Sequence, residues 1–207
     1  MINKASLGQL LKTRPFLEIY IMTLGSFPLS IYLIGNLKTY GQETINNESF
    51  LAFSATFSSV FSIFRFVWSF LLEKYSYRSI YGTLLCIQIF MGVGIPLLIR
   101  YLPDSGFTMG FFLFVDCASK MTMGGHMVLV PTIFAKIYGP DGGMRVFSVG
   151  FSFATVASLM NTIVTEALLS PIGYDGILLS YTVFSAISLT YLIFFYKYRR
   201  ITAEDLS

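Results

Sequence analysis

The sequence predicts an all-α membrane protein, and three observations lead to that prediction. Hydrophobic residues make up 55% of the 207 residues and charged residues only 12%, whereas soluble domains carry about 25% charged residues. The mean hydropathy is +0.69. Apolar stretches of bilayer-spanning length alternate with short polar segments rich in Gly, Pro, Lys and Arg. The net charge of +3, without a dense basic run, does not favour nucleic-acid binding.

Six apolar stretches are expected to be transmembrane helices, because each supplies roughly 20 mostly apolar residues. They cover residues 16–37, 50–72, 79–102, 106–135, 144–169 and 174–196. The fourth is the longest, and its Gly124, Gly125 and Pro131 predict a bend within one span.

The polar residues at both ends of the chain set the expected domain organisation. Residues 1–15 are basic and lack acids, with spaced apolar residues, which is typical of an amphipathic helix on a membrane surface. A remnant of a targeting segment has the same composition, whereas a secretory signal peptide is not expected. We therefore expect a basic amphipathic arm at 1–15, a six-helix transmembrane bundle at 16–196 and a short polar tail at 197–207.

Lysine and arginine alternate between the connecting segments. Ten lie in the arm, the second loop, the fourth loop and the tail, whereas the other three loops together hold only Lys38 and Arg100. This bias predicts both termini on the cytosolic side, or on the matrix side of an organellar membrane. The basic arm suggests the mitochondrial inner membrane, with the plasma or vacuolar membrane as alternatives.

Charged residues inside the apolar stretches are candidate site residues, because a charge near the bilayer centre costs about 2.5–3.5 kcal/mol. Asp116 and Lys120 are one helical turn apart, so they can pair with each other or line a pathway. Arg65 has no acid within a turn of its own stretch. Its partner is expected on another helix, with Asp116 as a candidate, or in a ligand or another chain. His126 is expected to be a hydrogen-bonded packing residue or a proton carrier.

The remaining reactive residues do not predict catalysis. Glu18 and Glu166 lie near span ends, where they can reach the headgroups or belong to a site. Cys86 and Cys117 are expected to be buried small hydrophobic residues rather than a disulfide or metal site. One histidine and no Cys/His cluster predict no metal and no other cofactor. No nucleophile lies beside a plausible base, so we expect no enzyme.

Two segments resemble the major facilitator superfamily. Residues 65–78, RFVWSFLLEKYSYR, are similar to the eighth helix and following loop of that superfamily, with Glu73, Lys74 and Arg78 at the acidic and basic motif positions. Residues 124–139 resemble the tenth helix of its oxalate/formate-antiporter-like (monocarboxylate transporter-like) branch. Residues 11–14 and 36–41 also fit the start of that branch's C-terminal half.

The resemblance implies half of a transporter fold, built from two inverted three-helix units at 16–102 and 106–196. Arg65 then corresponds to an arginine that faces an anionic substrate. The second basic residue expected in the eleventh helix is missing from 144–169 beyond Arg145, and Lys120 is a candidate replacement.

Two functions follow from this resemblance. The first is an accessory subunit of a larger membrane complex, such as a mitochondrial respiratory assembly, with other membrane subunits as partners. The second is a transporter of small carboxylate anions, formed by pairing with a second six-helix half.

Overall fold

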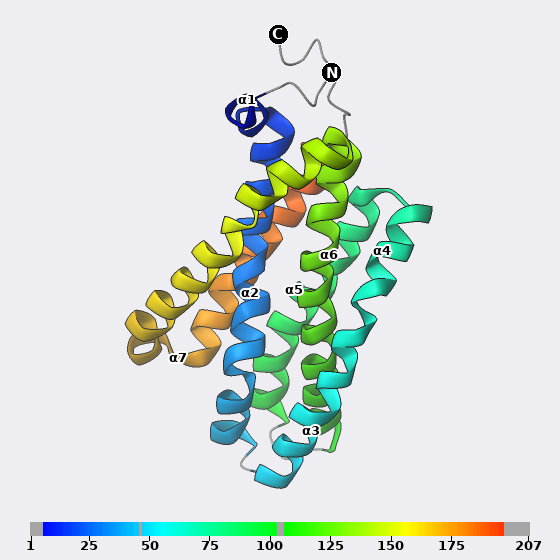
Figure 1. Ribbon diagram of the computed structural model, residues 1–207. Coiled ribbons are helices and arrows are strands. Elements are labelled where there is room, and N and C mark those ends of the chain that lie inside the picture. The colour runs from blue at the N-terminus through cyan, green and yellow to red at the C-terminus, as the bar shows by residue number, and fades with distance from the viewer. Residues whose placement is uncertain (1–5, 46, 103–105, 197–207) are drawn as a thin grey trace.

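The computed structural model describes residues 6–45, 47–102 and 106–196, and within these ranges it contains helices and no strand. Figure 1 shows the helices side by side along one long axis. They are α1 (Leu7–Leu11), α2 (Arg14–Thr44), α3 (Glu48–Val60), the 3-10 turn η2 (Phe61–Phe64), α4 (Arg65–Lys74), α5 (Tyr77–Tyr101), α6 (Gly106–Gly150) and α7 (Ser152–Phe194).

Four helical runs of the described chain are long and apolar enough to cross a membrane. These are Arg14–Thr44, Glu48–Lys74, Tyr77–Tyr101 and Gly106–Phe194. The prediction of an all-α membrane protein is therefore confirmed.

The last of these runs is broken at two glycines. Gly139 in α6 has a φ of 79° and Gly173 in α7 a φ of 67°, values that glycine adopts without steric cost. Pro140 follows the first glycine and Pro171 precedes the second, and proline interrupts the helical hydrogen-bond ladder. The chain changes direction within both helices (Figure 1). Both glycines lie in segments predicted to be loops.

Other boundaries differ from the prediction. α2 continues past residue 37 to Thr44, and the second apolar stretch is interrupted by η2. Backbone angles stay helical through Gly124, Gly125 and Pro131, so the helix is not broken where a bend was expected. Gly125 instead permits close packing, because a Cβ there would lie 2.4 Å from Leu84 Cδ1.

Side-chain contacts gather one set of helix ends together. The hydroxyls of Thr13 and Tyr138 share a hydrogen bond, and the rings of Tyr77 and Tyr196 lie 5.7 Å apart. The starts of α2 and α5, the Gly139 turn and the end of α7 therefore share one end of the bundle. We call it the basic end, because Lys12, Lys74, Arg78 and Lys136 belong to it, as the charge alternation predicts.

The opposite end brings together the end of α2 and the Gly173 turn. The Tyr40 hydroxyl donates a hydrogen bond of 2.5 Å to Asp175 Oδ1. The Tyr32 hydroxyl donates to the Tyr174 carbonyl oxygen at 3.1 Å. Segments more than a hundred residues apart in the chain are thus joined at both ends of the bundle.

The N-terminal arm is partly docked on this bundle. Ser6 caps α1 through a capping box with Gln9, and Leu10 is fully buried in the core. Leu10 and Leu11 of this helix therefore pack on the bundle, and its position at the membrane surface stays a prediction. Residues 1–5 of the arm and the predicted tail at 197–207 lie outside the described residues.

The two cysteines are free thiols in different surroundings. Cys117 is buried as expected, but Cys86 is exposed, so the expectation of burial is wrong for Cys86. Helical spacing places Cys86 on the same side of α5 as Phe90, Val93 and Leu97, all of which are exposed. This apolar outer stripe suits contact with lipid.

α5 and α7 cross closely at Gly92. A Cβ added at Gly92 would lie 2.0 Å from Thr182 Oγ1 and 3.2 Å from Thr182 Cβ. The Thr182 side chain can pack directly on the α5 backbone here only because Gly92 has no side chain. Small residues serve the same purpose at other membrane helix crossings.

We expect Gly92→Ala to destabilise the protein by about 1–3 kcal/mol, because the new methyl group overpacks this crossing. Gly82→Ala on the same helix is the matched control, since the nearest side-chain atom to its new Cβ is 3.7 Å away. Thermal unfolding in lipid nanodiscs measures both variants. Equal melting temperatures for the two would show that the crossing is not as close as described.

Candidate functional site

A cavity of about 490 Å³ opens between α2, α6 and α7. Its lining is mainly apolar and includes two hydroxyl side chains. The lining residues are Phe27, Ile31, Ile34 and Gly35 of α2, Met123 and Met127 of α6, and Ala154, Thr155 and Ser158 of α7. We call this cavity the groove.

Lys120 lies on the side of α6 that faces the groove. Lys120, Met123 and Met127 follow the i, i+3, i+7 spacing of one helix face, and all three are half-buried. At 1.5 Å per residue, Lys120 is about 21 Å from Gly106 at the start of the helix, which is well inside a membrane. It forms no ion pair or hydrogen bond with any described residue. The proposed pair with Asp116 is therefore not formed.

Asp116 has a different partner. Its side chain is 8% exposed, and its Oδ2 accepts a hydrogen bond of 2.8 Å from Ser54 Oγ of α3. The carboxylate thus joins α3 to α6 rather than neutralising Lys120 or Arg65. Ser54 was not predicted as this partner, because residues 50–72 hold several hydroxyl side chains and their spacing does not indicate which of them meets Asp116.

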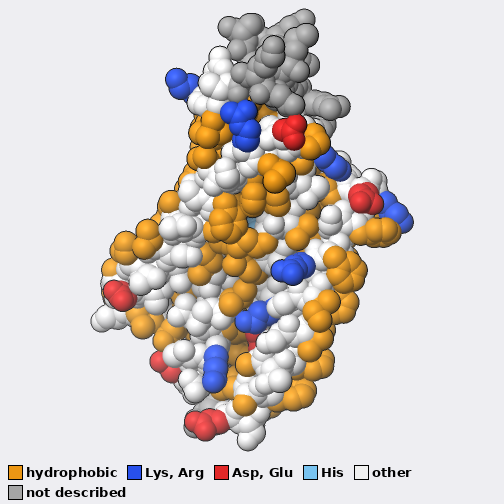
Figure 2. All heavy atoms as spheres, in the orientation of Figure 1, with side chains coloured by type: hydrophobic (Ala, Val, Ile, Leu, Met, Phe, Trp, Pro, Cys, Tyr) orange, Lys and Arg blue, Asp and Glu red, His pale blue; other side chains and the backbone are white. Residues whose placement is uncertain are grey.

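Arg65 is exposed and stands directly after η2, as the first residue of α4. α4 crosses α6 there, since a Cβ added at Gly124 would lie 2.7 Å from Arg65 Cβ. Its neighbours Ile63, Phe64 and Phe66 are also exposed. Arg65 forms no ion pair or hydrogen bond within the described chain. Figure 2 shows basic side chains partway along the molecule, mostly among hydrophobic and uncharged ones.

His126 lies in the interior and not in the groove. It is fully buried, with Tyr81 Oη 3.4 Å from its Nδ1 and Gln88 Nε2 3.1 Å from its Nε2. Gln88 also bonds to Ser30 Oγ, and Tyr81 lies 2.9 Å from Ser26 Oγ. This network joins α2, α5 and α6, as expected for a hydrogen-bonded packing residue. Gln88 is a lone amide in an apolar stretch, a signal from which the network could have been predicted.

The carboxylates near span ends behave differently from each other. Glu18 is 8% exposed and accepts hydrogen bonds from Arg14 Nε at 2.6 Å and from the Tyr191 hydroxyl at 3.1 Å. It therefore joins α2 to α7. Glu166 is exposed.

The motif-like loop lies at the basic end, where Glu73, Lys74 and Arg78 are all exposed. The Lys74 ammonium lies 4.7 Å from the centre of the Phe70 ring. These three charged residues are not part of the groove.

No family model, curated protein or solved structure matches this chain. Within the described ranges, no group of three His, Cys, Asp or Glu side chains is arranged to hold a metal ion. The features that bear on function are therefore the groove, Lys120 on the side of α6 that faces it, and Arg65 where α4 crosses α6.

Proposed function

We propose that this chain is a six-span half-transporter of major facilitator type that serves as an accessory subunit of a larger membrane complex. The observation that carries the proposal is two cations partway along apolar helices, the half-buried Lys120 and the exposed Arg65, neither of which has an anionic partner in the described chain. In this proposal another membrane protein covers the groove.

The six-span arrangement is supported by the two glycine breaks and by the grouping of helix ends. If Gly139 and Gly173 lie in loops, the chain passes along the bundle six times. Thr13, Tyr77 and Tyr138 then share the basic end because each follows an even number of passes. The positive-inside bias assigns this end to the cytosol or matrix.

What covers the groove face determines the energetic cost of the nearby cations. A basic side chain near the bilayer centre costs about 2.5–3.5 kcal/mol when lipid surrounds it. Protein contacts or a water-filled space at the groove would remove that cost for Lys120, and a partner that also covered the start of α4 would remove it for Arg65. The exposed phenylalanines beside Arg65 favour a mainly apolar protein partner with an anionic group.

Purification of the native complex in a mild detergent tests the accessory role. We expect the wild-type chain to be recovered in a particle whose mass is that of a complex with an unrelated subunit. Lys120→Met should shift much of it to the mass of the free chain, whereas Met144→Leu, at an exposed position of the same helix, should not. A wild-type chain recovered alone from its native membrane would contradict the proposal. Fractionation of the same cells would test our assignment to the mitochondrial inner membrane.

A second function, exchange of small carboxylates, is supported by the chemistry of the groove. The hydroxyls of Thr155 and Ser158 line the groove, and Lys120 lies on the side of α6 that faces it; such donors can hold a carboxylate. A second six-helix half would have to complete the site. Uptake of labelled formate by reconstituted protein, lost in Arg65→Ala and retained in Arg100→Ala, would favour this function over the accessory role.

A further inference from the structure

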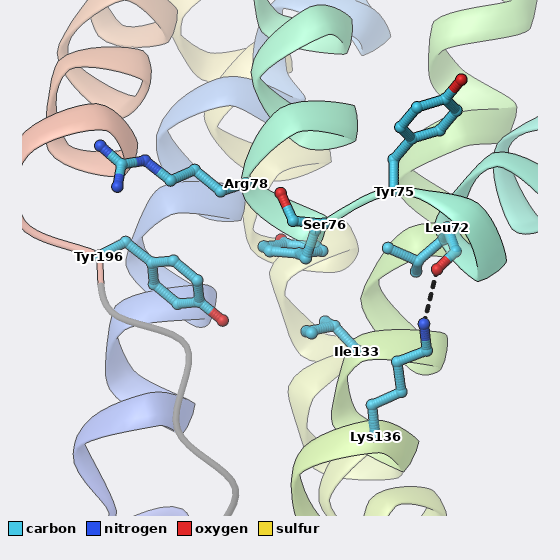
Figure 3. Close-up of a pocket in the computed structure, with 8 residues that line it drawn as sticks. Leu72, Tyr75, Ser76, Arg78, Ile133, Lys136 and Tyr196 are labelled. Atoms are coloured by element: carbon cyan, nitrogen blue, oxygen red, sulfur yellow. Dashed lines mark hydrogen bonds between the residues drawn. The ribbon is translucent and has the colours of Figure 1, made fainter.

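A second cavity, of about 580 Å³, lies at the basic end, remote from the groove. The α4–α5 turn, α6 and the end of α7 surround it. Figure 3 shows Arg78 and Tyr196 on one side and Lys136 on the other. The buried side chains of Leu72 and Ile133 form an apolar part of its wall.

The charges around this cavity are positive. Among the described residues that line it, Arg78 and Lys136 are basic and none is acidic. Lys136 Nζ donates one hydrogen bond, of 2.6 Å, to the Leu72 carbonyl oxygen, which leaves two of its three donors available. Arg78 is exposed and forms no ion pair within the described chain. Glu73, near the end of α4, does not line the cavity.

The start of α5 adds further donors. Ser76 is the N-cap, and its Oγ accepts a hydrogen bond of 3.2 Å from the Ser79 N–H. The Ser76 carbonyl oxygen accepts from the Ile80 N–H, so the N–H groups of Tyr77 and Arg78 precede the helical ladder. These N–H groups and the positive end of the helix dipole favour the binding of an anion at the start of α5.

The Tyr77 side chain is an independent indication of a ligand. It lines the cavity and is only 4% exposed, yet its hydroxyl is buried without a hydrogen-bond partner in the described chain. Its ring is held between Tyr81, at 5.1 Å, and Tyr196, at 5.7 Å. Buried polar groups are nearly always paired. An anionic oxygen in the cavity would supply the missing acceptor.

We propose that this cavity binds a phosphate group, held by Arg78, Lys136, the Tyr77 hydroxyl and the first turn of α5. The same chemistry fits the headgroup of an anionic lipid or free inorganic phosphate. The apolar wall of Leu72 and Ile133 suits the glycerol and first acyl carbons of a lipid.

Thermal unfolding of the purified chain in a non-ionic detergent tests this site with three probes: short-chain phosphatidic acid, inorganic phosphate and short-chain phosphatidylcholine. We expect saturable stabilisation by phosphatidic acid and little by phosphatidylcholine. Arg78→Gln should weaken the binding about tenfold or more, since a charge-assisted hydrogen bond is lost. Tyr77→Phe, which keeps the ring, should weaken it about two- to tenfold.

Arg100→Gln is the matched control, because it removes one exposed positive charge from the opposite end of the same helix. The affinity of this variant for phosphatidic acid should stay within about twofold of the wild-type affinity. Tight binding of phosphatidic acid but only millimolar binding of inorganic phosphate identifies a lipid site, and similar affinities identify a site for free phosphate. The proposal would be overturned if neither phosphatidic acid nor inorganic phosphate bound saturably. It would also be overturned if Arg78→Gln and Arg100→Gln lowered the binding affinity equally.

Discussion

Replacing His126 by alanine is expected to lower the free energy of unfolding by about 3–5 kcal/mol. The imidazole is fully buried, and truncation of a large buried side chain to alanine costs about this much. Its ring makes edge contacts with Phe27 at 5.3 Å and Tyr81 at 5.5 Å, which the variant loses. Gln88 also loses a partner, although its Oε1 already lacks one in the described chain.

Equilibrium unfolding in mixed micelles measures this loss. Met144→Ala is the matched control on α6, because the Met144 side chain is 75% exposed and its truncation leaves no buried cavity. The network account requires a much larger loss for His126→Ala than for Met144→Ala. Similar losses would mean that the histidine is not the enclosed centre of a three-helix network.

Arg65→Leu is expected to have opposite effects on the isolated chain and on its complex. In a lipid nanodisc the free chain should gain about 2–3 kcal/mol of stability, because the variant removes an unpaired charge from an apolar surface. The same variant should weaken assembly with the proposed partner, whose anionic group loses its counter-charge. Unfolding of the free chain and the fraction recovered as complex measure the two effects.

Phe66→Leu is the control for this experiment, since Phe66 is exposed beside Arg65 but carries no charge. It should leave both measurements nearly unchanged. If Arg65→Leu destabilised the free chain, Arg65 would have to make a stabilising contact within its own bundle. The case for a covering partner would then be lost.

The helices and their breaks were largely predictable because they depend on local patterns. Apolar runs of sufficient length gave the membrane helices, and Gly139 and Gly173, each within two residues of a proline, marked the breaks. The clustering of basic residues at one end followed from their alternation between loops. The interruption by η2 was not predictable, since residues 61–64 have no distinctive composition.

The candidate site was harder to predict, because its contacts join distant parts of the chain. Asp116 and Lys120 have the spacing of an intrahelical pair, yet the aspartate bonds to Ser54, 62 residues away. Which of two possible partners a carboxylate takes depends on helix packing, and packing does not follow from spacing. For Arg65, the sequence correctly indicated that no acidic residue lies within one helical turn. It did not predict that the Arg65 side chain is exposed.

The central claim is that protein rather than lipid covers the groove, and photocrosslinking in the native membrane tests it most directly. A photoreactive residue at Met123 lies in the groove, and one at Ile187, which is 58% exposed on α7, serves as the comparison. Our account predicts a protein adduct of one defined mass from position 123 and lipid adducts alone from position 187. Lipid adducts alone from both positions would contradict it.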